Sequence, residues 1–211
     1  DLEEIMNSAK NGVILLSLGT NIKSANLKDE IKQTFLKVFA KLSQTVLWKF
    51  ETDDLKTVPK NVIIRKWLPQ NDILGHPNIK LFLSHGGSLS TQEAMYHGVP
   101  VVGIPFFSDQ FLNIHQMKKK GIAEHIDLKK NVTADEMYEK IQMVLNSNSY
   151  KSKIDKISKL YRDRPQTALE KAIFWIEYVM RHGTAEHLVL PARDMPSYKT
   201  GNLDVLAVFV L

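Results

Sequence analysis

The chain has 211 residues, 44% of them hydrophobic and 24% charged, so it is long enough to bury one sizeable core and has the composition of a globular protein. No cysteine is present, which excludes disulfides and thiolate metal sites. The net charge of +5 suits an anionic ligand or membrane surface, whereas no basic stripe interleaved with aromatic residues indicates nucleic acid.

Segments of strand length alternate with segments of helix length along the chain. Residues 1–6 have the pattern of an amphipathic helix, residues 27–42 have apolar side chains at the i, i+4, i+7 spacing of a longer one, and a short helix is expected to end near Gly75. Continuous apolar runs indicate buried strands. Five strands and a weaker sixth are predicted on this basis, over residues 12–18, 45–50, 61–67, 81–83, 99–105 and 122–126.

Short polar sequences predict where further helices begin and end. The S/T-x-x-E spacing of a capping box occurs at Ser90, Thr133 and Thr167, so a helix is expected to open at each. The helix from Thr133 is expected to reach about Leu145. The helix from Thr167 is expected to end at the basic residues just before Gly183.

Strands that alternate with helices predict a parallel sheet with helices on both faces, so the expected fold is α/β and doubly wound. Two of the predicted helices, at Ser90 and at Ser108, follow neighbouring strands. Helix N-termini at the carboxyl ends of parallel strands are typical positions for anionic ligands. The pair Gly86-Gly87 lies before the first of these helices and lets a ligand approach the backbone with no Cβ in the way.

Several kinds of α/β site are excluded by spacing. Gly19 stands alone after the first strand, so the G-x-G-x-x-G dinucleotide motif is absent, and no G-x-x-x-x-G-K-[ST] motif occurs either. The sequence from His85 to Ser90 resembles a hydrolase nucleophile elbow, but Ser90 stands where G-x-S-x-G needs its second glycine. No D-x-D or His/carboxylate cluster predicts a metal site, so helix dipoles and backbone N–H groups would have to neutralise a phosphate.

Residues 84–110, with the sequence SHGGSLSTQEAMYHGVPVVGIPFFSDQ, resemble the signature of the UDP-glycosyltransferases, which move a sugar from a UDP-sugar to small lipophilic acceptors. The shared pattern is a His-x-Gly, a Glu eight residues after the His, a Val-Pro, a second Pro and a final Asp-Gln. Residues 15–20, 67–77 and 174–182 agree with it. The resemblance covers nearly the whole chain but only the C-terminal, donor-binding half of these two-domain GT-B enzymes, which implies a Rossmann-like sheet.

The resemblance implies a uridine-binding role for four residues. Trp67 would stack on the uracil, the backbone of Leu68 and the side chain of Gln70 would complete the base and ribose contacts, and Glu93 would accept hydrogen bonds from both ribose hydroxyls. Each role has a structural alternative. Trp67 would instead fill the core at the end of a strand, Gln70 would only begin a helix, and Glu93 would fold back on Ser90 in the capping box.

The same resemblance implies contacts to the diphosphate. His85 would hydrogen-bond a diphosphate oxygen, the alternative being a structural histidine after a strand. Gly87, Ser88 and Ser90 would belong to the loop that offers backbone N–H groups and hydroxyls to the phosphates. Many members of the family carry a polar residue where Leu89 stands, so one phosphate contact would be missing and Ser90 would replace it.

The transferred sugar would meet Asp109 and Gln110, whose alternative role is a favourable polar first turn of a helix. Thr20, after the first strand, would close over the phosphates. Glucose is expected rather than glucuronic acid, because no cation follows Asp109 or Gln110 directly. The implied ligand is the UDP-sugar donor; no cofactor, no metal and no nucleic acid are implied.

The implied activity is that of an inverting glycosyltransferase that conjugates a sugar to small lipophilic acceptors. In this family the acceptor pocket and the general base, a His oriented by an Asp, belong to the N-terminal half. The chain alone is therefore expected to bind UDP without turnover, and no catalytic residue is named. The alternatives are a non-catalytic nucleotide-binding or oligomerisation module of the same fold, and a cell-wall or sterol glycosyltransferase. Whether the chain forms a homo-oligomer is left open.

The expected division is a donor-binding domain at residues 1–183 and an extension at residues 184–211 that leads towards a membrane anchor. Leu203–Leu211 is apolar but shorter than the roughly 20 residues that span a bilayer, and reads either as a terminal strand or as the start of a membrane helix. Asn131-Val132-Thr133 is a glycosylation sequon, although Thr133 also suits a helix cap. The resemblance implies the lumenal face of the endoplasmic reticulum membrane, with this fragment itself soluble.

Overall fold

The computed structural model describes residues 1–53, 55, 57–130, 132–183 and 185–210. These residues form two compact units, Asp1–Asp163 and Arg164–Leu211, which are treated separately. The predicted glycosylation site at Asn131 lies outside the described residues. The predicted functional boundary at Gly183 stays a prediction.

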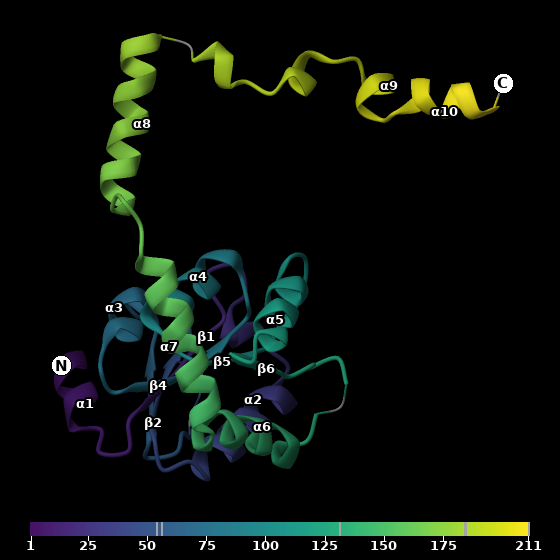
Figure 1. Ribbon diagram of the computed structural model, residues 1–211. Helices are drawn as coiled ribbons and strands as arrows, with labels where there is room; N and C mark the ends of the chain where they lie inside the picture. The colour runs from purple at the N-terminus through teal and green to yellow at the C-terminus, as the bar shows by residue number, and fades with distance from the viewer. Residues whose placement is uncertain (54, 56, 131, 184, 211) are drawn as a thin grey trace. The chain divides into compact units, whose positions relative to one another are not determined.

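A single parallel sheet forms the centre of the Asp1–Asp163 unit (Figure 1). Its strand order is β3-β2-β1-β4-β5-β6, and each neighbouring pair is parallel. All of the predicted strands are present, including the weak sixth. Their bounds are β1 (Val13–Ser17), β2 (Thr45–Lys49), β3 (Val62–Arg65), β4 (Ile79–Ser84), β5 (Val101–Gly103) and β6 (Ala123–His125).

Helices cover both faces of the sheet, which confirms the doubly wound α/β prediction. On one face pack α2 (Asp29–Ala40) and α6 (Ala134–Asn146), and on the other pack five helices that share a second core cluster. Those five are α1 (Leu2–Ser8), α3 (Gln70–Gly75), α4 (Ser88–His97), α5 (Gln110–Lys119) and α7 (Asn148–Arg162). A short 3₁₀ turn, η1 (Ser24–Asn26), precedes α2.

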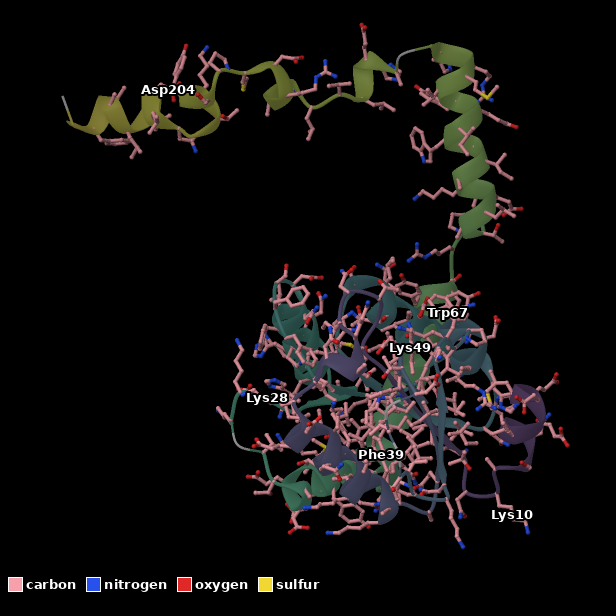
Figure 2. The ribbon with its side chains drawn as sticks, turned by 180° about the vertical axis from the view of Figure 1, so that it is seen from behind. Lys10, Lys28, Phe39, Lys49, Trp67 and Asp204 are labelled. Atoms are coloured by element: carbon pink, nitrogen blue, oxygen red, sulfur yellow. The ribbon has the colours of Figure 1, made fainter. Side chains whose placement is uncertain are left out.

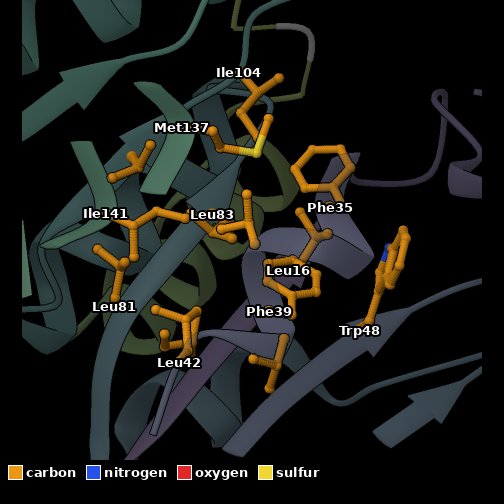
Figure 3. Packing of buried hydrophobic residues seen from close by; sticks show 14 of the residues in the cluster. Leu16, Phe35, Phe39, Leu42, Trp48, Leu81, Leu83, Ile104, Met137 and Ile141 are labelled. Carbon is orange, nitrogen blue, oxygen red and sulfur yellow. The ribbon is translucent and has the colours of Figure 1, made fainter. Parts of the chain in front are cut away.

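The inner strands β1, β2, β4 and β5 are buried on both faces, as their continuous apolar runs predicted, whereas the edge strands β3 and β6 are only partly buried. Alternate side chains of β1, for example Leu15 and Leu16, enter opposite core clusters. The core under α2 contains Trp48, which is fully buried beside Phe35 and Phe39 (Figure 3). Its ring centroid lies 5.7 Å from that of Phe35 and 5.6 Å from that of Phe39, and its Nε1 donates to Ser24 Oγ at 3.1 Å.

Two of the three predicted capping boxes are confirmed. Thr133 and Thr167 each accept a hydrogen bond from the backbone N–H three residues on, and the glutamate there returns one. The box at Ser90 is wrong, because α4 begins two residues earlier with Gly87 as its N-cap. The helix predicted to open over Ser108-Asp109-Gln110 is present, with Asp109 as its N-cap. Ser108 has a left-handed φ of 56°, and the helix begins at Gln110.

Helix α7 was not predicted, although Ile154 and Ile157 have the i, i+3 spacing of a helix and pack in one core cluster. Within its 15 residues, only Ile154 and Ser158 are buried.

The Arg164–Leu211 unit begins with α8 (Ala168–His182) and ends in short helical segments. These are η2 (Glu186–Leu188), η3 (Pro191–Asp194), α9 (Ser197–Thr200) and α10 (Leu203–Val210). The tail is therefore helical up to Val210, and the alternative of a terminal strand is wrong. Within the part of the chain that the structure describes, no helix combines the length and apolarity needed to cross a membrane.

Candidate nucleotide-sugar site

The strand order reverses at β1 and β4, which are neighbours at the centre of the sheet. In open α/β sheets, ligands bind at this switch point, beyond the carboxyl ends of the strands. A cavity of about 680 Å³ lies there, lined by the last residue of β2 and by the segments that follow β1, β3, β4 and β5. All eleven predicted site residues line it: Thr20, Trp67, Leu68, Gln70, His85, Gly87, Ser88, Ser90, Glu93, Asp109 and Gln110. The structure therefore brings the whole predicted set together.

Trp67 follows β3 and is 68% exposed, so the alternative in which it fills the core is wrong. Its ring is available for stacking on a base. The next residue, Leu68, is 3% exposed and packs its side chain into the core, which leaves its backbone to line the cavity. Leu68 therefore holds this segment against the core, while the neighbouring Trp67 exposes its aromatic face to the cavity.

Gln70, the first residue of α3, connects that helix to α4. Its Nε2 donates to Ser90 Oγ at 3.0 Å and to Glu93 Oε2 at 2.6 Å. Glu93 is therefore held by Gln70 and not by the backbone of Ser90, so the capping alternative for Glu93 is wrong. Its Oε1 has no hydrogen-bond partner among the described residues, which leaves one carboxylate oxygen as an acceptor in the cavity.

His85 follows β4 and lies against two glycines. A Cβ added to Gly87 would lie 2.4 Å from His85 Nε2, and one added to Gly19 would lie 2.7 Å from its Cε1. The Nδ1 atom is buried without a partner among the residues that the structure describes. Unpaired buried polar atoms are rare because they cost about 1–3 kcal/mol, and they point to a functional role.

The protonation state of His85 follows from this burial. Burial lowers the pKa of His85 below 6.5, and the negative charge of Asp109 offsets this only in part. The imidazole is therefore neutral at pH 7 and carries one N–H donor.

The N-terminus of α4 completes the phosphate side of the cavity. Gly87 is its N-cap and makes no side-chain cap, so the first backbone N–H groups of the ten-residue helix have no partner within the helix. Ser88 and Leu89, the first two residues of the helix, are both exposed, so this end of α4 faces solvent. The positive end of the helix dipole points in the same direction.

The loop between β5 and α5 supplies the remaining side of the cavity. Asp109 is exposed, and its Oδ2 accepts from Asn113 Nδ2 at 2.8 Å. Gln110 is 4% exposed, and its Oε1 accepts from the backbone N–H groups of Phe106 and Phe107 at 2.8 and 3.2 Å. Gln110 therefore holds the loop in shape, and only its Nε2 donor is left for a ligand.

Sequence reasoning missed two residues at this site. Lys49, the last residue of β2, lines the cavity while only 7% exposed. The sequence feature that could have revealed Lys49 is that it is the single charged residue within the apolar run at 45–50. Asn113 donates to Gly86 O at 3.0 Å as well as to Asp109, and its signal was the i, i+4 spacing from that aspartate.

A second groove among the described residues, of about 870 Å³, runs along the start of α2 and the segment after β6. Lysines and apolar side chains line it, so it lacks this combination of groups. Among the described residues, no group of three or more His, Cys, Asp or Glu side chains is placed to hold a metal ion.

The fold and the cavity together define a Rossmann-like nucleotide-binding domain of the kind found in glycosyltransferases. The sequence model of the family described as "UDP-glucoronosyl and UDP-glucosyl transferase" matches residues 1–211. The chain belongs to this family.

Individual relatives agree with the family match. The chain is 42% identical to UDP-glycosyltransferase UGT5 of Dactylopius coccus over 213 residues, covering 100% of this chain and 40% of that protein. It is 39% identical to human UDP-glucuronosyltransferase 2B15 over 208 residues, covering 98% and 39%. The chain thus spans about two fifths of the length of these relatives.

Solved structures agree with the fold. Os79 from O. sativa, determined in complex with UDP, matches with a TM-score of 0.73 at 20% identity, covering 87% of this chain and 43% of that one. The prediction of a Rossmann-like sheet of the GT-B glycosyltransferase type is confirmed.

The stability of the chain is expected to fall as the pH is lowered from 7.5 to 5.5. Burial lowers the pKa of His85, His97 and His125 in the folded state, whereas the unfolded chain titrates near 6.5. The unfolded state therefore binds more protons below that pH, so the free energy of unfolding increases with pH and levels off above about 6.5. Thermal unfolding followed by circular dichroism at a series of pH values measures this. A melting temperature that is constant or rises towards pH 5.5 would contradict it.

Proposed function

We propose that this chain binds the UDP-sugar donor of an inverting glycosyltransferase that conjugates a sugar to small lipophilic acceptors. One observation carries the proposal. Eleven residues that follow four separate strands, and that are together expected to contact the uridine, the diphosphate and the sugar, line one cavity at the switch point of the sheet. Membership of the family supports the donor class.

At the uridine end, Trp67 stacks on the uracil and Gln70 holds the carboxylate of Glu93 in place for the ribose. The hydrogen bond from Gln70 Nε2 to Glu93 Oε2 restrains the carboxylate before a ligand arrives. A restrained acceptor loses less conformational freedom on binding, which favours affinity. Glu93 Oε1 then accepts hydrogen bonds from the ribose hydroxyls.

At the diphosphate, the neutral ring of His85 and the N-terminus of α4 act together. The reaction breaks the bond between the anomeric carbon and the diphosphate while the acceptor oxygen attacks that carbon, so negative charge grows on the departing UDP. Donors fixed in advance at the site of growing charge lower the barrier of such a step. We assign the acceptor pocket and the general base to the remaining part of the protein.

The transferred sugar lies near Asp109, and we propose glucose rather than glucuronic acid. The side chain that hydrogen-bonds Asp109 is the uncharged Asn113. The nearby His85 is held neutral by burial. A carboxylate on the sugar would meet the negative charge of Asp109 without a compensating cation, whereas the hydroxyls of glucose would donate to it.

We also propose that the full protein is held at the lumenal face of the endoplasmic reticulum membrane through its C-terminal segment. The apolar composition of α10 supports this placement. The sequon at Asn131 is compatible with the same compartment.

Calorimetric titration of the 211-residue chain tests the donor proposal. UDP and UDP-glucose are expected to bind, UDP-glucuronic acid to bind more weakly, and no glycosyl transfer to occur. Glu93→Gln is expected to weaken UDP binding about tenfold, which corresponds to one charge-assisted hydrogen bond. The matched control Glu139→Gln, an exposed residue of α6, is expected to leave binding unchanged. A chain that self-associates but binds no UDP would instead support an oligomerisation module.

A further inference from the structure

A largely buried positive charge lies at the carboxyl end of β2, where it forms part of the cavity lining. The side chain of Lys49 is 9% exposed and forms an ion pair with Glu51, which is 18% exposed, with 3.1 Å between Nζ and Oε1. Burying charges is costly, and a buried pair adds little net stability compared with an apolar pair of similar size. Stability alone therefore gives little reason for an ion pair at this position.

The pair connects β2 to the loop that follows β1. Lys49 Nζ donates to the carbonyl oxygen of Gly19 at 2.8 Å, and Glu51 Oε2 accepts from the backbone N–H of Ala25 at 3.2 Å. The loop is thereby attached at both of its ends. Gly19 and Thr20 of this loop line the cavity, so the attachment fixes one of the cavity walls.

Lys49 also contacts a second wall of the cavity. Its Nζ lies 5.8 Å from the ring centroid of Trp67, within the range of a cation–π interaction. Figure 2 shows the two labelled side chains next to each other at one end of the sheet. Trp67 is 68% exposed, so the contact with Lys49 restrains a ring that has few other neighbours.

We propose that Lys49, held by Glu51, is a positioning residue for the donor site. It holds the Gly19–Ala25 loop and the ring of Trp67 in a fixed relative position. A nucleotide therefore contacts both without first having to order them. Glu51 neutralises the charge of Lys49, and two of the three N–H donors of Lys49 are directed at Gly19 and Glu51. In this proposal Lys49 therefore acts by holding the cavity walls and not by direct contact with the diphosphate. The proposal rests on the proposed function, because it assigns Trp67 to the base.

The test compares Lys49→Met/Glu51→Gln with the unmodified chain. The double variant removes both charges, so it leaves no unpaired buried charge that would unfold the chain. Lys41→Met/Asp135→Asn is the matched control, since it removes an exposed ion pair of the same type between α2 and α6. Calorimetric titrations with UDP and with uridine are the first measurement. Because uridine has no phosphates, it separates a positioning role from a charge effect on the diphosphate.

The double variant is expected to bind UDP and uridine each about tenfold more weakly, by the same factor, and the control to bind both normally. The single variant Lys49→Arg is expected to keep most of the affinity of the unmodified chain, because a guanidinium can still donate to Gly19 and Glu51. Loss of UDP affinity with uridine affinity unchanged, or no change in either, would overturn the proposal.

A measurement without ligand separates this proposal from the proposed function. Hydrogen exchange of the backbone amides in the Gly19–Ala25 loop is expected to accelerate in the double variant and to stay unchanged in the control. If the unmodified chain bound neither nucleotide, the proposed function would fail, and this measurement would still test the attachment of the loop. Equal exchange in the double variant and the unmodified chain would show that Lys49 and Glu51 do not hold it.

Discussion

Alanine in place of His85 is expected to weaken the binding of UDP about 10- to 150-fold, which corresponds to the roughly 1.5–3 kcal/mol of a hydrogen bond to a charged group. Burial holds the imidazole neutral, so its single N–H is available to a phosphate oxygen at pH 7. The melting temperature is expected to change little, because the Nδ1 atom of His85 makes no hydrogen bond within the described chain whose loss would destabilise the fold.

Calorimetry with UDP and uridine measures this effect, and His115→Ala is the control. His115 is an exposed residue of α5, so its removal is expected to leave both affinities unchanged. Uridine is expected to bind His85→Ala almost normally, because the lost contact is to phosphate. Equal losses for UDP and uridine, or UDP affinity unchanged, would contradict the role of His85.

Alanine in place of Trp48 is expected to destabilise the Asp1–Asp163 unit by about 3–5 kcal/mol, the range for removing a large aromatic side chain from a core. Trp48 packs against Phe35 and Phe39 at one side of the cluster under α2 (Figure 3). The change also leaves the hydroxyl of Ser24, which is fully buried, without the indole N–H that it accepts. Domains are stable by only about 5–15 kcal/mol, so this loss is a large fraction of the total.

Urea denaturation followed by far-ultraviolet circular dichroism measures this loss. Trp48→Phe is the graded variant, because it keeps an aromatic ring and removes the indole N–H, so a smaller loss is expected. Trp175→Ala is the control in the other unit, where the ring packs against Phe174 and Tyr178. A loss below about 1 kcal/mol for Trp48→Ala, the size of an ordinary point substitution, would show that the cluster repacks around the cavity.

The strands and the order of the elements could be predicted from the sequence because both faces of the sheet are buried. Continuous apolar runs such as the one that contains Val13–Ser17 arise only under this condition. Helix starts were predicted less well. Thr133 and Ser90 have the same S/T-x-x-E spacing, but α4 starts directly after the turn that ends β4, so Gly87 takes the N-cap position and Gln70 engages Glu93. The partner that decides the outcome lies 23 residues away.

The candidate site was predicted as a set because the carboxyl ends of parallel strands share one edge of the sheet. What each side chain does there depended on contacts that the sequence does not contain. Gln110 is buried and holds the backbone of its own loop, although its position beside Asp109 suggested an open ligand contact. Lys49 was missed because a lysine within an apolar run reads as the end of a buried strand and not as a site residue. Its contacts with Gly19 and Trp67 appear only in the folded chain.

The close fit of His85 against its glycine neighbours limits the order in which this loop is able to change during evolution. A Cβ at position 87 would lie 2.4 Å from His85 Nε2, so no larger residue fits at Gly87 while the imidazole stays in place. A side chain at position 87 therefore requires His85 to move aside or to be lost. Once position 87 carries a side chain, the ring regains this position only if the glycine is restored, so the two positions constrain each other.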